Sequence, residues 1–123
     1  MMNKPEGYVS ATEDGREKVV TDLLPDEERR KNLFPCGRLD KNTLGLIILT
    51  NDGDSAHRLL SPKHHVPKTY VFKSKFPLTE DDVKNLEAGV DIGGYVTKPC
   101  KVSPDEDRMG GKITITEGKY HQI

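Results

Sequence analysis

The longest apolar run of the chain covers residues 44–49, in which five of six side chains are aliphatic. The sequence Asn51-Asp52-Gly53 follows directly and is a turn signal. A short aliphatic run that ends at a turn is typical of a buried strand. The pattern therefore predicts a buried central strand over residues 44–50, with the loop before it held on a rigid support.

Other segments alternate between apolar and polar residues, as half-buried strands do. Over residues 68–75 the alternation puts Tyr70 and Phe72 on one face and Thr69, Val71 and Lys73 on the other. Alternation and turn signals predict three further strands, over 96–102 (beginning on either side of Pro99), 112–116 and 119–123.

Helical spacing of apolar residues occurs in three places. Residues 16–24 can form a short helix with Val19, Val20, Leu23 and Leu24 on one face, followed by a charged turn or helical start over 25–31. Asp54 or Ser55 can cap a helix through Leu60, with Ala56, Leu59 and Leu60 packing inward. The acidic start at 79–82 predicts a third helix that ends at Gly89.

Helices and strands are interspersed, and their connections vary from hairpin length to crossover length. This arrangement favours an α+β fold, with a mixed, mostly antiparallel sheet and flanking helices. A chain of 123 residues is expected to form one domain over 1–123.

Composition and charge narrow the class of protein. No stretch approaches a membrane span, no signal peptide opens the chain, and Cys36 and Cys100 are far apart, so we expect a cytoplasmic protein with free thiols. The net charge of -1 hides a basic block, because residues 29–75 contain ten basic and three acidic side chains. Such a block favours a polyanionic partner, nucleic acid first, although an ordinary solvated face would look the same.

Asp40 lies in the loop before the predicted central strand, two residues after Arg38. In an extended segment both side chains would face the same way, and an arginine would keep the carboxylate ionised and oriented. Asp40 could act as a nucleophile, a general base or a metal ligand, or could simply bond its own backbone in a turn. The residues alone leave these alternatives open.

Two further patterns suggest chemistry. Asp52, Asp54 and His57 could join Asp40 in a metal site, which would fit a metal-dependent nuclease, although a turn and helix cap explain them equally well. The sequence Lys68-Thr69-Tyr70 could place a tyrosine against a nucleobase and a lysine against a phosphate. A half-buried core tyrosine would give the same pattern.

Five further motifs lie along the chain: KPEGYV at 4–9, GRLDKNTLGL at 37–46, LTNDGDSAHRLLSPKHHVPKTY at 49–70, TKP at 97–99 and ITEGKYHQI at 115–123. Taken together, they resemble the catalytic domain of bacterial ribosomal RNA pseudouridine synthases. The resemblance implies isomerisation of a uridine within RNA to pseudouridine, without a metal or organic cofactor. It implies that Asp40 is the nucleophile, that Tyr70 lies against the target base and is a candidate for proton transfer, and that Arg38 lies near the nucleophile and the RNA backbone.

The resemblance also implies an RNA partner and a chain that is shorter than the usual members of the family. The segment SPKHHVPKTY is most similar to enzymes that modify 16S rather than 23S rRNA, and the expected RNA contacts are Lys63, His64, His65, Lys68, Lys119 and His121. Members of the family usually have an S4 domain before this region and a basic residue after GKYHQI. We therefore expect a catalytic domain that lacks the S4 domain and is truncated at its C-terminus. The alternative is a non-catalytic RNA-binding fragment on the same scaffold.

Overall fold

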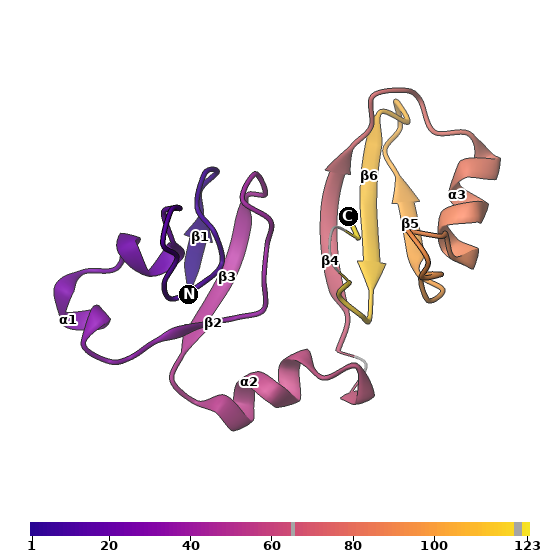
Figure 1. Cartoon of the computed structure of the whole chain (residues 1–123). Helices are drawn as coiled ribbons and strands as arrows, with labels where there is room; N and C mark the ends of the chain where they lie inside the picture. Colours follow the sequence, from indigo (N-terminus) through magenta and orange to yellow (C-terminus); the bar gives the residue numbers. More distant parts are fainter. Residues whose placement is uncertain (65, 120–121) are drawn as a thin grey trace. The chain divides into compact units, whose positions relative to one another are not determined.

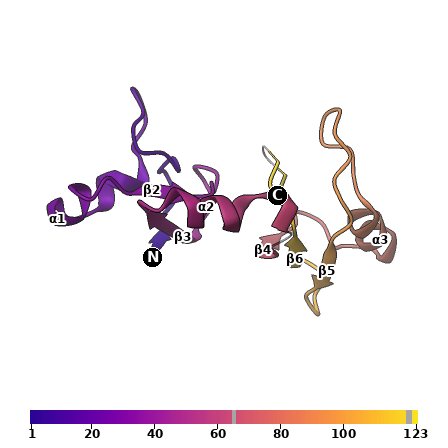
Figure 2. The ribbon, with the colours of Figure 1, turned by 90° about the horizontal axis from the view of Figure 1, so that it is seen from below.

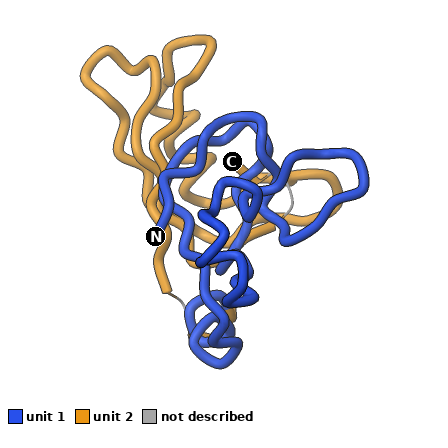
Figure 3. The backbone as a smooth tube through the Cα atoms, turned by 90° about the vertical axis from the view of Figure 1, so that its left-hand side faces the viewer, with its two compact units in different colours: residues 1–60 blue, residues 61–123 orange. Residues whose placement is uncertain are grey.

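A computed structural model of the chain describes residues 1–64, 66–119 and 122–123. The backbone divides into two compact units, Met1–Leu60 and Ser61–Ile123 (Figures 1 and 3). Each unit contains a three-stranded antiparallel sheet and helical segments. This confirms the predicted α+β class and the antiparallel pairing of the strands, which lie in two separate sheets. The single domain over 1–123 stays a prediction.

The sheet of the first unit has the order β1-β3-β2. Its strands are β1 (Met2–Lys4), β2 (Phe34–Cys36) and β3 (Gly45–Thr50). The predicted central strand is confirmed as β3, but its predicted burial is wrong for every second residue: Ile47 is 3% exposed, whereas Leu46 is 66% exposed. Successive side chains of a strand point to opposite faces, and only the Ile47 face is packed within this unit.

The helix predicted over 16–24 is wrong, because this stretch contains only one 3-10 turn, at Val20–Leu23. The backbone before it is extended and pairs with Val9, whose N–H donates to the carbonyl of Lys18 at 2.8 Å and whose carbonyl accepts from Val20 at 3.0 Å. Val19 and Val20 are buried by this pairing. β-branched residues suit extended backbone, and a contact with a distant segment outweighs local helical spacing.

Two short helices complete the first unit. The charged stretch after Pro25 forms one turn, α1 (Asp26–Arg29), as predicted, and α2 (Gly53–Leu60) follows β3. The cap of α2 differs from the prediction: the carboxylate of Asp52 accepts the backbone N–H groups of Asp54 and Ser55, each at 3.1 Å. Ala56 is buried as predicted, but Leu59 and Leu60 are 41% and 37% exposed, so their inward packing was predicted wrongly.

The sheet of the second unit has the order β4-β6-β5. Its strands are β4 (Lys68–Lys73), β5 (Lys101–Pro104) and β6 (Gly110–Ile115), and α3 (Glu80–Ala88) lies beside β5 (Figure 2). The alternation predicted for β4 is confirmed, because Tyr70 and Phe72 are half-buried and Val71 is 74% exposed.

Two strand predictions in this unit need correction. The strand expected over 96–102 begins only at Lys101, and Val96 makes an isolated bridge with Asp91. Pro99 explains the late start, since proline offers no N–H to a ladder. Over 119–123, the described residues Lys119, Gln122 and Ile123 belong to no strand.

The third predicted helix is confirmed as α3. The Thr79 hydroxyl accepts the N–H of Asp82 at 3.1 Å, and the Asp82 carboxylate accepts the N–H of Thr79 at 2.8 Å. These two bonds form a capping box, which satisfies free N–H groups at the start of the helix. The helix ends at Gly89, whose φ of +116° favours glycine.

Gly89→Ala is expected to destabilise the second unit by about 3 kcal/mol, because it adds both backbone strain and a clash. A Cβ at Gly89 would lie 2.3 Å from the carbonyl oxygen of Thr97. Gly93→Ala is the matched control, since its φ is +94° but a Cβ there meets nothing within 4 Å; strain alone costs about 1 kcal/mol. Urea unfolding measures both variants. Equal losses of unfolding free energy would show that the clash with the carbonyl oxygen of Thr97 contributes nothing.

Candidate functional site

The predicted catalytic loop, residues 37–43, connects β2 to β3 in the first unit. It leaves β2 through Gly37, whose φ is +96°, and closes with a turn in which the N–H of Thr43 donates to the carbonyl of Asp40 at 2.9 Å. Arg38 and Asp40 are both exposed. The loop therefore presents these two side chains outward from a short, folded connection.

The side chain of Lys4 binds the backbone of this loop. Its side chain is fully buried, and its Nζ donates to four backbone carbonyls, those of Pro5 (3.1 Å), Asp40 (3.0 Å), Lys41 (3.1 Å) and Thr43 (2.8 Å). Three of these carbonyls belong to the loop. Since a buried ammonium needs partners of this kind, the backbone around Asp40 is fixed to the end of β1.

Two further contacts fix the same loop. The hydroxyl of Ser10 donates to the carbonyl of Leu39 at 2.8 Å and accepts the N–H of Leu39 at 3.0 Å. The N–H of Gly7 donates to the carbonyl of Lys41 at 2.8 Å. The first ten residues of the chain thus hold the loop on both sides of Asp40.

The ammonium of Lys4 also acts electrostatically on the loop. Burial lowers the pKa of Lys4 from its ordinary value of 10.5, and the carboxylates of Asp40 and Glu6 oppose that shift. The carboxylate of Asp40 therefore lies within electrostatic reach of a buried positive charge. A fixed backbone and a nearby cation are what a reactive carboxylate needs in order to be held in one orientation.

Sequence reasoning missed the roles of Lys4 and Ser10. Lysine is almost never fully buried, so burial of Lys4 was not expected from the sequence. No local pattern in the sequence marks it, because its partners in the loop lie 36 to 39 residues further along the chain. Ser10 carries no local pattern, because Leu39, its partner, lies 29 residues away.

The remaining predicted site residues belong to the second unit. Tyr70 is half-buried on β4, opposite Ile113 of β6. Lys68 begins the same strand and is half-buried, whereas three predicted RNA contacts are exposed: Lys63, His64 and Lys119. His65 and His121 lie outside the described residues. Asp40 and Tyr70 belong to different units, and their meeting in one site stays a prediction.

The metal-site alternative gains no support from the fold. Within residues 1–64, 66–119 and 122–123, no three His, Cys, Asp or Glu side chains form a group that could hold a metal ion. Asp52, which that alternative requires, uses its carboxylate to cap α2. Helix capping therefore explains Asp52.

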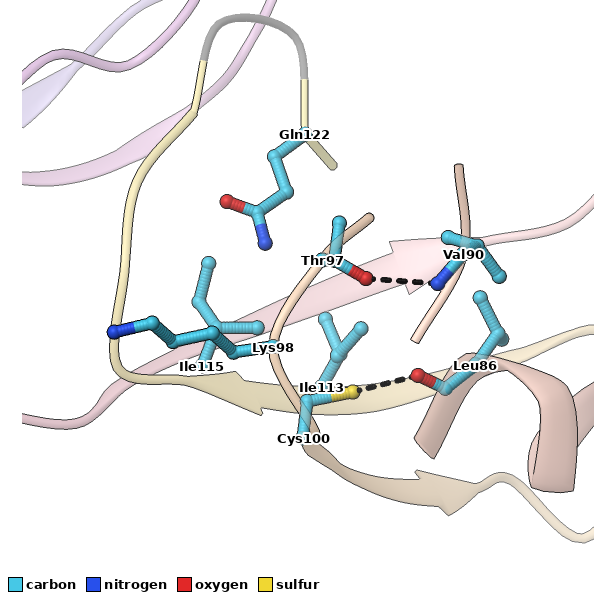
Figure 4. Close-up of a pocket in the computed structure, with 8 residues that line it drawn as sticks. All are labelled: Leu86, Val90, Thr97, Lys98, Cys100, Ile113, Ile115 and Gln122. Carbon is cyan, nitrogen blue, oxygen red and sulfur yellow. Dashed lines mark hydrogen bonds between the residues drawn. The ribbon is translucent and has the colours of Figure 1, made fainter. Parts of the chain in front are cut away.

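The second unit contains a cavity of about 30 Å³. Figure 4 shows side chains that line it, among them Leu86, Val90, Ile113 and Ile115. The Sγ of Cys100 donates to the carbonyl of Leu86 at 3.1 Å, and burial raises the pKa of this thiol, as do the carboxylates of Glu87 and Glu117. A space of this size holds no substrate. Cys100 is therefore a protonated packing residue, and both cysteines are free thiols.

The described helices are all too short or too polar to cross a membrane.

The predicted site residues lie in two places: the loop of Arg38 and Asp40 in the first unit, and the basic residues around β4 and after β6 in the second.

The known proteins that are similar to this chain are named as pseudouridine synthases. A family profile described as RNA pseudouridylate synthase matches residues 1–123. The RNA pseudouridine synthase YtzG of Bacillus subtilis is 56% identical over 127 residues, covering 100% of this chain and 53% of its own. Ribosomal small subunit pseudouridine synthase A of Escherichia coli K12 is 38% identical over 128 residues, with coverage of 100% and 53%.

Two further matches also cover nearly the whole chain. The dual-specificity RNA pseudouridine synthase RluF of Escherichia coli is 40% identical over 122 residues, covering 99% of this chain and 41% of its own. A crystal structure of a pseudouridylate synthase superimposes with a TM-score of 0.88 at 36% identity, covering 98% of this chain and 52% of the other. The chain thus spans about half the length of these relatives.

Proposed function

The chain belongs to the RNA pseudouridylate synthase family, and from that premise we propose that it isomerises a uridine of ribosomal RNA to pseudouridine, with Asp40 as nucleophile. The supporting observation is an exposed Asp40 on a loop whose backbone is bonded to the buried Lys4. Exposure lets the carboxylate meet a substrate as large as RNA. The fixed backbone keeps it in one place while bonds change.

The reaction needs such a carboxylate. The bond from C1′ of the ribose to N1 of the base breaks, the base turns, and a bond from C1′ to C5 forms. Hydrogen leaves C5 and N1 gains one, so substrate and product have the same atoms and no co-reactant is consumed. Asp40 can act by attack at the sugar C1′, where it captures the electron-poor sugar as the bond to N1 breaks, or by addition at C6 of the base.

Other residues handle the RNA in this proposal. A uridine in structured RNA must leave its stack before a side chain can reach its sugar, and Tyr70 supplies an aromatic surface for the flipped base. Arg38 acts on the RNA backbone beside the nucleophile. The basic side chains Lys63, His64, His65, Lys68, Lys119 and His121 bind phosphates.

The substrate is proposed to be 16S rather than 23S rRNA. Synthases whose name states the small ribosomal subunit are 38–40% identical over the whole chain. An rRNA substrate also places the protein in the bacterial cytoplasm. Supplying unmodified 16S and 23S rRNA in parallel, and mapping new pseudouridines chemically in each, tests both the reaction and the choice of RNA.

The result separates this function from two others. Isomerisation that is insensitive to EDTA supports the proposal, whereas EDTA-sensitive cleavage of the RNA would identify a nuclease instead. A non-catalytic RNA-binding module is the second candidate, because the chain spans only about half the length of its relatives. RNA binding by the 123-residue chain without any isomerisation, while the chain extended to the length of its relatives is active, would assign binding to this part.

Tyr70→Phe is expected to keep more isomerase activity than Tyr70→Ala. The ring of Tyr70 offers stacking, which contributes about 1–3 kcal/mol per base, and phenylalanine keeps that ring. Single-turnover rates on 16S rRNA measure both variants. Equal losses would assign the role to the hydroxyl, and thus to proton transfer, instead of to stacking.

A further inference from the structure

Glu117 is a buried carboxylate that the proposed reaction does not use. It is only 3% exposed. Its Oε2 accepts the hydroxyl of Tyr95 at 2.6 Å, and its Oε1 accepts the backbone N–H of Lys98 at 2.8 Å and the side-chain amide of Gln122 at 3.0 Å. One carboxylate therefore joins the loop before β5 to the segment after β6.

The charged form of Glu117 is the one that the fold keeps. Burial by itself would raise the pKa of Glu117, but the hydrogen bonds from Tyr95, Lys98 and Gln122 outweigh it and hold the pKa below its ordinary value. The hydrogen bond to Glu117 raises the pKa of Tyr95, so the Tyr95 hydroxyl stays a donor. A buried carboxylate with three donors is a rigid anchor.

Two exposed lysines extend from this anchor. The Nζ of Lys119 lies 4.1 Å from the centroid of the Tyr95 ring, and the Lys119 N–H donates to the side-chain oxygen of Gln122 at 2.9 Å. Lys98 is fixed at its backbone N–H by Glu117. Figure 4 shows its side chain extended, with the ammonium away from the apolar side chains that line the cavity.

We propose that Lys98 and Lys119 form one phosphate-binding surface for the RNA strand, and that Glu117 and Tyr95 are positioning residues for it. This inference rests on the proposed function, since it names an RNA contact surface of the same protein. Lys98 is absent from the contacts that the sequence suggested, and Glu117 and Tyr95 touch no substrate in this account.

The physical reason is preorganisation. A free surface lysine loses side-chain entropy when it binds a phosphate, and a lysine that is already held loses less. The face of Tyr95 attracts the Lys119 ammonium without using its N–H donors, which stay available for phosphate oxygens. The Glu117–Tyr95 bond keeps that ring in place.

Salt dependence of RNA binding tests the surface. We use the 123-residue chain, a short uridine-containing single-stranded RNA, and the slope of log K against log salt. Lys98→Met and Lys119→Met are each expected to reduce the slope by about 0.7, the value for one lost phosphate contact on a single strand. Lys84→Met is the matched control, since Lys84 is an exposed lysine of α3, and its slope is expected to equal the wild-type slope.

A double-mutant cycle tests the positioning role. Tyr95→Leu is expected to weaken RNA binding in the wild-type background and to have no further effect in Lys119→Met, because it acts through that lysine. Tyr95→Phe keeps the ring under Lys119 and is expected to lose less of the slope than Tyr95→Leu. Thermal unfolding of each variant shows that the fold is retained.

The outcomes are distinct. Unchanged slopes in Lys98→Met and Lys119→Met, while the wild-type chain binds RNA, would overturn this surface and leave the proposed function standing. Additive effects of Tyr95→Leu and Lys119→Met would overturn the positioning role. A wild-type chain that binds no RNA even at low salt would overturn this inference, and would overturn the proposed function as well if the chain extended to the length of its relatives also formed no pseudouridine.

Discussion

Replacing Lys4 by methionine is expected to lower the unfolding free energy of the first unit by about 3–5 kcal/mol, as when one partner of a buried charged network is removed. Methionine keeps most of the volume and removes the ammonium. The four carbonyls of Pro5, Asp40, Lys41 and Thr43 then lose their common donor. Three of these groups belong to the predicted catalytic loop, so the loss falls on the segment that carries Asp40.

Lys41→Met is the matched control for stability. Its Nζ pairs with Glu17 at 2.6 Å, but both side chains are nearly half exposed. An exposed pair contributes at most about 1 kcal/mol. Urea unfolding of the two variants gives the comparison, and equal losses would show that burial of Lys4 contributes little.

Hydrogen exchange gives a local readout of the same change. The N–H groups of Leu39 and Thr43 are bonded within or beside the loop, and we expect both to exchange faster in Lys4→Met than in Lys41→Met. Unchanged protection at Leu39 and Thr43 would mean that Ser10 and Gly7 suffice to hold the loop.

The parts of the fold that were predictable from sequence have local causes. β4 alternates strictly, and α3 carries its own capping box and its terminal Gly89. Both signals lie within one element, so reading along the chain finds them. The α+β class follows in the same way from the spacing of such elements.

The parts that were missed depend on distant partners. β2 contains Pro35, which argues against a strand unless it lies at an edge, and pairing with β3 places it there. The helix expected over 16–24 gives way to pairing between Val9 and Val19. Periodicity along a single segment contains no information about these pairings.

The residues of the candidate site also divide into those with a local signal and those that depend on distant partners. Asp40 and Arg38 were proposed from a motif within one loop, and both side chains are exposed in the fold; their role in a site stays a prediction. Lys4 was missed because its loop partners lie 36 to 39 residues further along the chain. A buried lysine becomes reasonable only once those carbonyls are known to surround it.

Asp40→Asn is expected to reduce isomerisation by about 10⁴-fold or more, the scale seen when an essential catalytic side chain is removed. Asparagine keeps the size and the hydrogen-bonding oxygen of the side chain, and the loop backbone is held by Lys4 and Ser10 independently of the carboxylate. The variant therefore removes the negative charge of the Asp40 carboxylate while these backbone contacts of the loop remain. RNA affinity is expected to stay close to that of wild type.

Asp52→Asn is the matched control for this change. It removes one carboxylate from the same region of the chain, and asparagine caps helices about as well as aspartate. Because Asp52 caps α2 and touches no proposed substrate, we expect its isomerase activity to remain near the wild-type value. A large loss of activity in Asp52→Asn would favour the metal-site alternative.

The most direct test is the yield of pseudouridine in unmodified 16S rRNA, mapped chemically after incubation with the chain extended to the length of its relatives, in three forms: wild type, Asp40→Asn and Asp52→Asn. The account predicts new pseudouridine with wild type and Asp52→Asn, and none above background with Asp40→Asn. Pseudouridine formed by Asp40→Asn at the wild-type rate would contradict it.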